Sequence, residues 1–267
     1  MLSVLNLAAG DGGYHPPSLS DFYPDSVLFE GTIFELDRLM LIRLLMSAVL
    51  VIVFMLAFRS PKLVPRGLQN VAEYGLDFVR IQIAESILGK ENGKRFLPIL
   101  TTIFFAVLFM NFSGIIPVLN ISSNGLIGMP IVLAALAYIV FNYVGIKKYG
   151  FFGYVKASIV VPDVPPALHI LLIPIEFLST FILRPFTLTV RLLANMMAGH
   201  IMLVLFFSAT QYFFFTTEAW TWVFGFPALI GGIAFTFFEL LVIGLQAYIF
   251  ALLTAVYIDL ADHAADH

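Results

Sequence analysis

Long apolar runs separated by short polar segments dominate this chain. Residues 39–58 contain one charge, Arg43, near the start of the run, and residues 96–118 and 130–146 contain none. A helix needs about 20 apolar residues to cross a bilayer, and the third run is short but adequate. Each run therefore predicts one transmembrane helix.

Two much longer apolar runs follow, at residues 167–215 and 220–257. Forty helical residues extend about 60 Å, which is twice the thickness of the hydrocarbon layer, and an ordinary tilt of about 20° does not absorb the difference. Either each run contains a tight hairpin, or the helices are steeply inclined. Because no polar turn interrupts the last run, we predict two long inclined helices. They form a hairpin over residues 167–260 that reverses around residues 212–221.

Residues 67–88 have an amphipathic pattern instead. The polar side chains fall within about 100° of one another on a helical wheel, and apolar residues occupy the rest. This pattern predicts a helix that lies on the cytoplasmic membrane surface. The alternative is a soluble helix packed on a partner. The polar set is Gln69, Asn70, Glu73, Asp77 and Arg80.

Basic residues cluster at 59–95 and 147–156, with two predicted spans between them. Positive residues next to spans stay cytoplasmic, so both clusters lie on the cytoplasmic side and the N-terminus lies outside. Residues 1–37 contain three prolines and six acids, which indicates an irregular polar outer tail. We therefore expect an all-α polytopic membrane protein with about five transmembrane helices, in which residues 38–267 form a single membrane domain.

Composition narrows the class further. Of 267 residues, 60% are hydrophobic and 12% are charged, against about 25% charged in soluble domains, so the chain is an integral membrane protein. The absence of cysteine excludes disulfides, thiolate metal sites and cysteine nucleophiles. The net charge of −3 argues against nucleic-acid binding. The polar start of the chain indicates neither a signal nor a transit peptide. No zinc-ligand spacing or phosphate loop is visible, so we expect no metal and no cofactor.

The most informative single residue is Arg191, which lies inside the first long run. An arginine at bilayer depth costs at least about 2.5–3.5 kcal/mol, and it cannot lose its proton to avoid that cost. By default such a residue meets an anion or repels cations in a pathway. The alternative is an arginine that pairs with a neighbouring helix or extends to the interface.

Other polar residues inside the two runs are few, and their spacing sorts them. Asn195 lies one helical turn from Arg191 and shares its face, whereas His200 lies about 180° round the helix. Glu239 and Gln246 lie within about 20° of each other on the second helix. Chains of acids and histidines carry protons across membranes, and histidine titrates near neutral pH. The alternatives are a core imidazole bonded to a carbonyl for His200 and a structural pair with His200 for Glu239.

Two blocks of sequence are familiar. RPFTLTVRLLANMMAGHIML, followed by FELLVIGLQAYIFALLTAVYI, resembles subunit a of the F-type ATP synthase in its bacterial form. A weaker likeness extends back to Leu39 and includes PKLVPRGLQNVAEYGLDFV. The resemblance implies an inclined C-terminal hairpin that faces a rotating ring of c subunits, whose carboxylates carry protons between two half-channels.

The resemblance also implies roles for the polar residues. Arg191 corresponds to the essential arginine between the half-channels, and Asn195 and Gln246 match its polar neighbours. His200 and Glu239 match the imidazole and acid of the outer half-channel. Some relatives have the two in reverse order, and either order keeps one of each.

Glu176 matches the carboxylate of the inner half-channel, with one departure. The gap from Glu176 to Pro185 is one residue longer than the family pattern. In an unbroken α-helix that extra residue rotates Glu176 by about 100° relative to Arg191.

The implied function is that of a non-catalytic stator subunit that conducts protons to and from the ring and couples their flow to ATP synthesis. The implied partners are the c-ring, subunit b of the peripheral stalk, the F1 sector indirectly and membrane lipids. The expected location is the bacterial plasma membrane, with the mitochondrial inner membrane as the alternative.

Two other classes of protein were weighed. A secondary transporter with a midplane ion site usually shows internal repeats and paired broken helices, and the two halves of this chain show no repeat. An intramembrane enzyme needs a nucleophile or metal constellation, and the sequence contains none.

Overall fold

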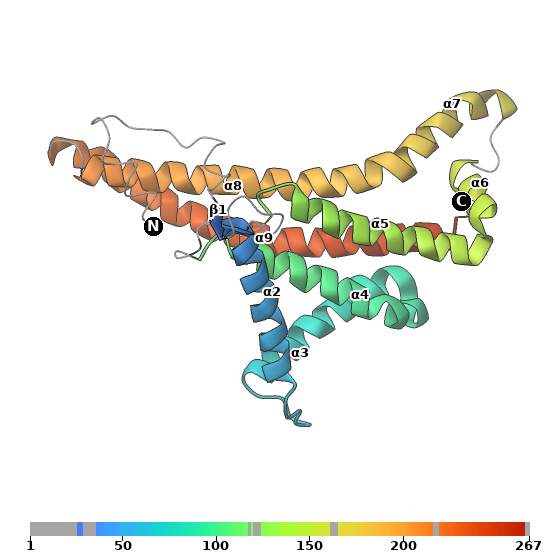
Figure 1. The fold of residues 1–267 in the computed structure, drawn as a ribbon, viewed down its shortest axis with the longest axis horizontal. Helices are drawn as coiled ribbons and strands as arrows, with labels where there is room; N and C mark the ends of the chain where they lie inside the picture. The colour runs from blue at the N-terminus through green and yellow to red at the C-terminus, as the bar shows by residue number, and fades with distance from the viewer. Residues whose placement is uncertain are drawn as a thin grey trace. The chain divides into compact units, whose positions relative to one another are not determined.

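The computed structural model describes residues 26–28, 36–116, 119, 124–160, 165–215 and 219–264. Helices dominate this part of the chain (Figure 1), as the sequence predicts. The helical elements are α2 (Arg38–Ala57), α3 (Leu68–Phe78), η2 (Val79–Glu85), α4 (Ser86–Phe112), α5 (Gly128–Tyr149), α6 (Phe151–Ile159), α7 (Pro166–Phe177), η3 (Leu178–Leu183), α8 (Arg184–Phe215), η4 (Ala219–Thr221) and α9 (Trp222–Asp262).

Five helical stretches within the described residues are long and apolar enough to cross a membrane. The predicted spans at residues 39–58 and 130–146 correspond to α2 and α5. The remaining three stretches are 68–112, 168–215 and 222–262. The prediction of an all-α membrane protein with five long apolar helices is therefore confirmed.

Contacts between residues divide the chain into two compact units. Unit 1 comprises Met1–Ala48, Phe109–Leu126 and Leu193–Leu245, and unit 2 comprises Val49–Leu108, Ile127–Leu192 and Gln246–His267. Each unit combines segments that are distant in sequence. The boundary passes through the middle of the longest helices, so the units are not sequence domains, and each is described separately below.

The described part of the polar tail contains a feature that the sequence did not predict. β1 (Ser26–Leu28) and β2 (Leu36–Asp37) pair in an antiparallel two-stranded sheet with an irregular register. The expectation of an irregular tail is therefore wrong for these five residues, because backbone pairing depends on two segments meeting, which periodicity does not report. Residues 1–25 and 29–35 lie outside the described part.

In unit 1, α2 packs on the segment that follows α4. The buried side chains of Leu39, Ile42 and Met46 form a small core with partly buried apolar residues of that segment. The Arg38 guanidinium donates a hydrogen bond to the carbonyl oxygen of Leu119 at 3.1 Å. The start of the first span is therefore held by both apolar and polar contacts.

In unit 2, the predicted surface helix folds back on the second span. The chain reverses at Gly89, whose φ of 73° lies in the left-handed region that favours glycine. The ring of Phe78 then lies 5.9 Å from that of Phe104, and a Cβ at Gly75 would lie 2.9 Å from Phe105. The apolar stretch 68–112 is thus a helical hairpin and not one 45-residue span.

The helical segment 68–85 has a buried face and an exposed apolar face. Val79 and Ile83 are fully buried, whereas Leu68, Val71 and Tyr74 are exposed. An exposed apolar stripe at helical spacing is typical of a helix that rests on a membrane surface. This placement on the membrane remains a prediction.

The C-terminal hairpin has the form predicted by the absence of a polar break. α8 has 32 residues and α9 has 41, and α9 continues through Pro227. Within unit 1 their adjoining parts run antiparallel and side by side (Figure 1). The aromatic pairs are Phe213 with Phe224 and Phe206 with Phe235, and the hydroxyl of Thr221 donates to the carbonyl of Phe213. The turn thus lies within the predicted range.

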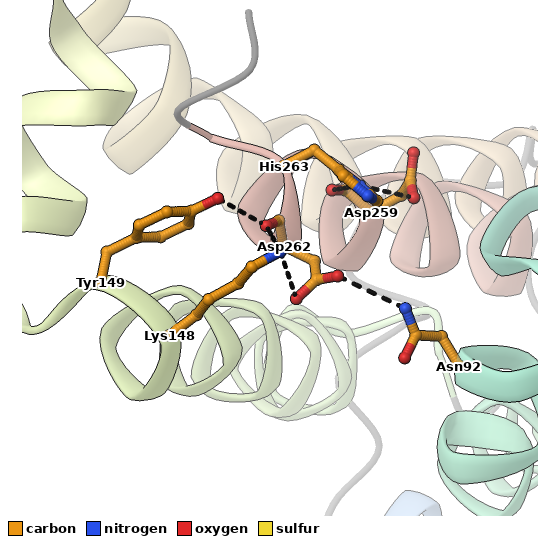
Figure 2. Close-up of polar contacts among 6 residues, drawn as sticks. All are labelled: Asn92, Lys148, Tyr149, Asp259, Asp262 and His263. Atoms are coloured by element: carbon orange, nitrogen blue, oxygen red, sulfur yellow. Dashed lines mark hydrogen bonds and ion pairs between the residues drawn. The ribbon is translucent and has the colours of Figure 1, made fainter.

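Asp262, the last residue of α9, is the centre of a polar cluster in unit 2 (Figure 2). Its carboxylate lies 3.3 Å from the Lys148 ammonium and accepts a hydrogen bond from the Asn92 amide. Its carbonyl oxygen accepts one from the Tyr149 hydroxyl at 2.9 Å. These contacts tie the end of α9 to α4 and α5.

We expect Asp262→Ala to destabilise the protein modestly. The carboxylate makes one partly exposed ion pair and one amide hydrogen bond, which together contribute about 1 kcal/mol. Thermal denaturation of the detergent-solubilised protein should show a decrease of about 2–4 °C in melting temperature. The matched control is Asp259→Ala, because that carboxylate pairs with His263 one turn along the same helix. Equal decreases in melting temperature for Asp262→Ala and Asp259→Ala would show that the contacts of Asp262 with α4 and α5 add no stability.

Candidate functional site

The most unusual group inside unit 1 is the carboxylate of Glu239. Its side chain is 5% exposed and lies on α9 in an otherwise apolar stretch. The carboxylate reaches α8 at Gly199, where an added Cβ would lie 2.2 Å from either carboxylate oxygen. His200, the next residue, is 7% exposed. The structure thus places the acid against the helix turn that carries the imidazole.

Gly199 is a residue of this site that the sequence reasoning missed. It separates Ala198 from His200 in a helix interior, where glycine costs about 1 kcal/mol relative to alanine. Its lack of a side chain leaves the space that the carboxylate of Glu239 occupies. The signal in the sequence was an isolated glycine inside a helical pattern, which often marks a close approach.

We expect Gly199→Ala to slow proton-driven ATP synthesis, the activity that the resemblance implies, by about three- to tenfold, corresponding to about 1 kcal/mol. The new methyl group must displace the carboxylate of Glu239, which can move because it ends a flexible side chain. Synthesis in membrane vesicles is the measurement. The matched control is Gly232→Ala on the same hairpin, where the nearest side-chain atom would be 3.4 Å away. Equal rates in both variants would mean that the position of the carboxylate is unimportant.

The remaining polar residues of the hairpin lie on its two helices. Arg191 is exposed on α8, and Asn195, one turn further on the same helix, is half-buried. Gln246 on α9 is 2% exposed. A permanent cation that the chain itself leaves uncovered, within an apolar helix, is available to an external anionic group.

Unit 2 contains a cavity of about 200 Å³. Glu176 of α7 and Arg184 of α8 supply its charges, and Tyr154, Ser158 and Thr180 supply hydroxyls. The guanidinium of Arg184 lies within electrostatic range of the carboxylate of Glu176 and of the hydroxyl of Tyr154. Apolar residues complete the wall of the cavity. They are Ala157 of α6, Leu260 and Ala261 of α9, and Ala264, which follows α9.

The stretch between Glu176 and Pro185, for which the resemblance implies one extra residue, contains a π-helical segment. η3 spans Leu178–Leu183 and lies between α7 and α8. Hydrogen bonds in a π-helix run from i to i+5, so a single π-turn takes up one more residue than an α-turn. The rotation of about 100° assumed an unbroken α-helix. The π-helical turn in this stretch departs from that assumption, and Glu176 lines the same cavity as Arg184.

Arg184 is a second residue of the candidate site that the sequence analysis did not single out. Its guanidinium carbon lies 5.3 Å from the ring centroid of Tyr257, a cation–π distance. It is only half-buried but lines the cavity. Spacing along one helix cannot show this, because Tyr154 and Tyr257 come from α6 and α9.

Comparison with known proteins identifies the chain's relatives. The family model described as ATP synthase A chain matches residues 40–259. The chain is 71% identical over its whole length to ATP synthase subunit a of Rhodococcus erythropolis, covering 96% of that protein. It is 41% identical to ATP synthase subunit a of a Parafrankia species, covering 98% of this chain and 91% of the relative. It is also 34% identical to that of Pseudarthrobacter chlorophenolicus, over the full length of both.

Proposed function

Because this chain belongs to the ATP synthase subunit a family, we propose that it conducts protons through two half-channels to and from a ring of c subunits. Membership makes the chain a membrane-embedded component of Fo that works in a complex with other ATP synthase subunits. The paths taken by the protons, the roles of individual residues and the direct partners belong to the proposal.

The observation that carries the proposal is the buried carboxylate of Glu239 against Gly199. An ionisable group in an apolar wall is costly unless it pairs or meets water. With the imidazole of His200 on the adjoining residue of α8, the pair supplies an acid and an imidazole, the two kinds of side chain from which proton relays in membranes are built. We assign these residues to the outer half-channel.

Arg191 separates the two half-channels in this proposal. A ring carboxylate that approaches the guanidinium meets a permanent cation in a medium of low dielectric, where its ionised form is favoured. It therefore releases its proton before it passes. Asn195 lies on the same face of α8. We assign Gln246 of α9 as a second polar neighbour of Arg191.

The inner half-channel is assigned to the cavity of unit 2. Glu176 is a carboxylate beside a space large enough for several water molecules, at about 30 Å³ each. The cavity is formed partly by α6, which follows the basic residues that predict the cytoplasmic side. The plasma membrane of a bacterium is the proposed location, and subunit b is proposed as the partner of the stator.

Affinity purification of the tagged chain from its native membrane tests the complex, and proton uptake into vesicles tests the channel. The c-ring and subunit b should co-purify. Vesicles that contain the assembled Fo sector should take up protons under an imposed potential, at a rate that Glu239→Gln reduces. Normal assembly with unchanged uptake in that variant would contradict the assignment of the outer half-channel.

A further inference from the structure

Tyr154 is the most deeply buried polar side chain among those that line the cavity of unit 2. It is 1% exposed, although α6 is a nine-residue helix outside the five long apolar stretches. Its ring meets that of Phe181 of η3 edge-on at 6.2 Å. A Cβ at Gly145 of α5 would lie 2.2 Å from this ring. Residues of α5 and η3 therefore pack against this tyrosine of α6.

The hydroxyl of this tyrosine lies among groups that exchange hydrogen bonds. It is hydrogen-bonded with the side chain of Ser158, one turn along α6, and it lies within electrostatic range of Arg184. Both hydroxyl residues line the cavity that Glu176 also lines. A hydroxyl donates one proton and accepts another, whereas a guanidinium only donates. Two linked hydroxyls can therefore pass a proton that Arg184 cannot.

We propose that Tyr154 and Ser158 form a hydroxyl relay that carries protons between the Glu176 cavity and the cytoplasmic surface. This inference rests on the proposed function of the cavity as the inner half-channel. In each transfer the hydroxyl oxygen accepts a proton on a lone pair and releases the proton that it held, so no charge accumulates on the tyrosine. Rotation of the hydroxyl then restores the starting arrangement. Arg184 acts as a positioning residue that orients the hydroxyl and the carboxylate.

Two further observations support an exchange of this kind. Burial raises the pKa of the Tyr154 hydroxyl above its ordinary value, and the hydrogen bond from Ser158 and the charge of Arg184 only partly oppose that effect. The hydroxyl thus keeps its proton at neutral pH. The groups around the hydroxyl include Ser158, Arg184 and Tyr138, and Glu176 is the one carboxylate among the described residues that line the cavity.

The test compares Tyr154→Phe with Ser158→Ala in the assembled Fo sector. Phenylalanine keeps the ring contacts with Gly145 and Phe181 and removes only the hydroxyl. Proton conduction in vesicles freed of the F1 sector should fall about fivefold in Tyr154→Phe. This loss is smaller than the 10²–10⁴-fold typical of a positioned proton-transfer group, because cavity water offers a slower bypass. The double variant should be no slower than Tyr154→Phe, since both hydroxyls belong to one path.

The matched control is Tyr143→Phe, because this α5 tyrosine is 58% exposed and does not line the cavity. It should conduct at the parental rate, and all variants should have parental thermal stability. Parental conduction in Tyr154→Phe, alongside slow conduction in Glu239→Gln, would overturn the relay alone. Parental conduction in both would overturn the proposed function itself. Multiplying losses in the double variant would show that the hydroxyls act separately, which would also overturn the relay.

Discussion

Arg191→Ala should abolish ATP synthesis and ATP-driven proton pumping while the complex still assembles. The guanidinium is exposed on the surface of α8, so its removal leaves no cavity inside the chain. Coupled rates should fall by roughly 100-fold or more, a change of about 2.7 kcal/mol or above. In the proposed mechanism, passive proton leak should persist or rise, because a protonated site of the ring could then move past position 191 without releasing its proton.

A loss of coupling with retained leak separates this role from a structural one. A residue needed only for folding would reduce assembly, pumping and leak together. Arg191→Lys should also fail largely, because a lysine can lose its proton when buried and lacks the planar fork of donors. The measurements are ATP synthesis, ATP-driven acidification and passive leak in the same vesicles. ATP synthesis coupled to proton flow in Arg191→Ala would contradict the proposed role of Arg191.

Glu239→Gln should slow proton-driven ATP synthesis by about 10- to 100-fold, at or below the lower end of the range for loss of a proton-transfer group. Glutamine keeps the shape of the side chain over Gly199 and removes its ability to exchange a proton. Glu239→Asp should slow synthesis less, because the shorter acid still titrates. Assembly is checked in parallel, and a parental rate with normal assembly would make the carboxylate structural.

Exchanging the imidazole of His200 and the carboxylate of Glu239 tests the proposed relay more sharply. The double variant His200→Glu with Glu239→His keeps one acid and one imidazole on the facing turns of α8 and α9. It should recover more activity than either single change, because a relay needs both groups but not a fixed order. A double variant no better than the worse single variant would show that each residue has its own structural requirement.

Much of the architecture could be predicted from the sequence, because the hydrocarbon layer of a membrane restricts which backbone structures can form. Backbone groups in hydrocarbon must be satisfied within the segment, so uninterrupted apolar runs predicted α2, α5 and the long helices of the hairpin. The same logic singled out Arg191, His200 and Glu239, since charge at bilayer depth is rare. Their spacing placed Arg191 and His200 on opposite faces of α8.

Tertiary structure decided what periodicity cannot report, namely which distant residues meet. The rotation of Glu176 expected from a regular α-helix does not apply, because the π-helical η3 lies between Glu176 and Arg184. The cavity of unit 2 is lined by residues of α6, α7, α8 and α9. The pattern along any one helix therefore could not show that Arg184 and Tyr154 line it. Gly199 matters because the carboxylate of Glu239 from another helix occupies its missing side-chain volume. Local hydropathy determines where helices form, whereas close packing between them determines which side chains face one another.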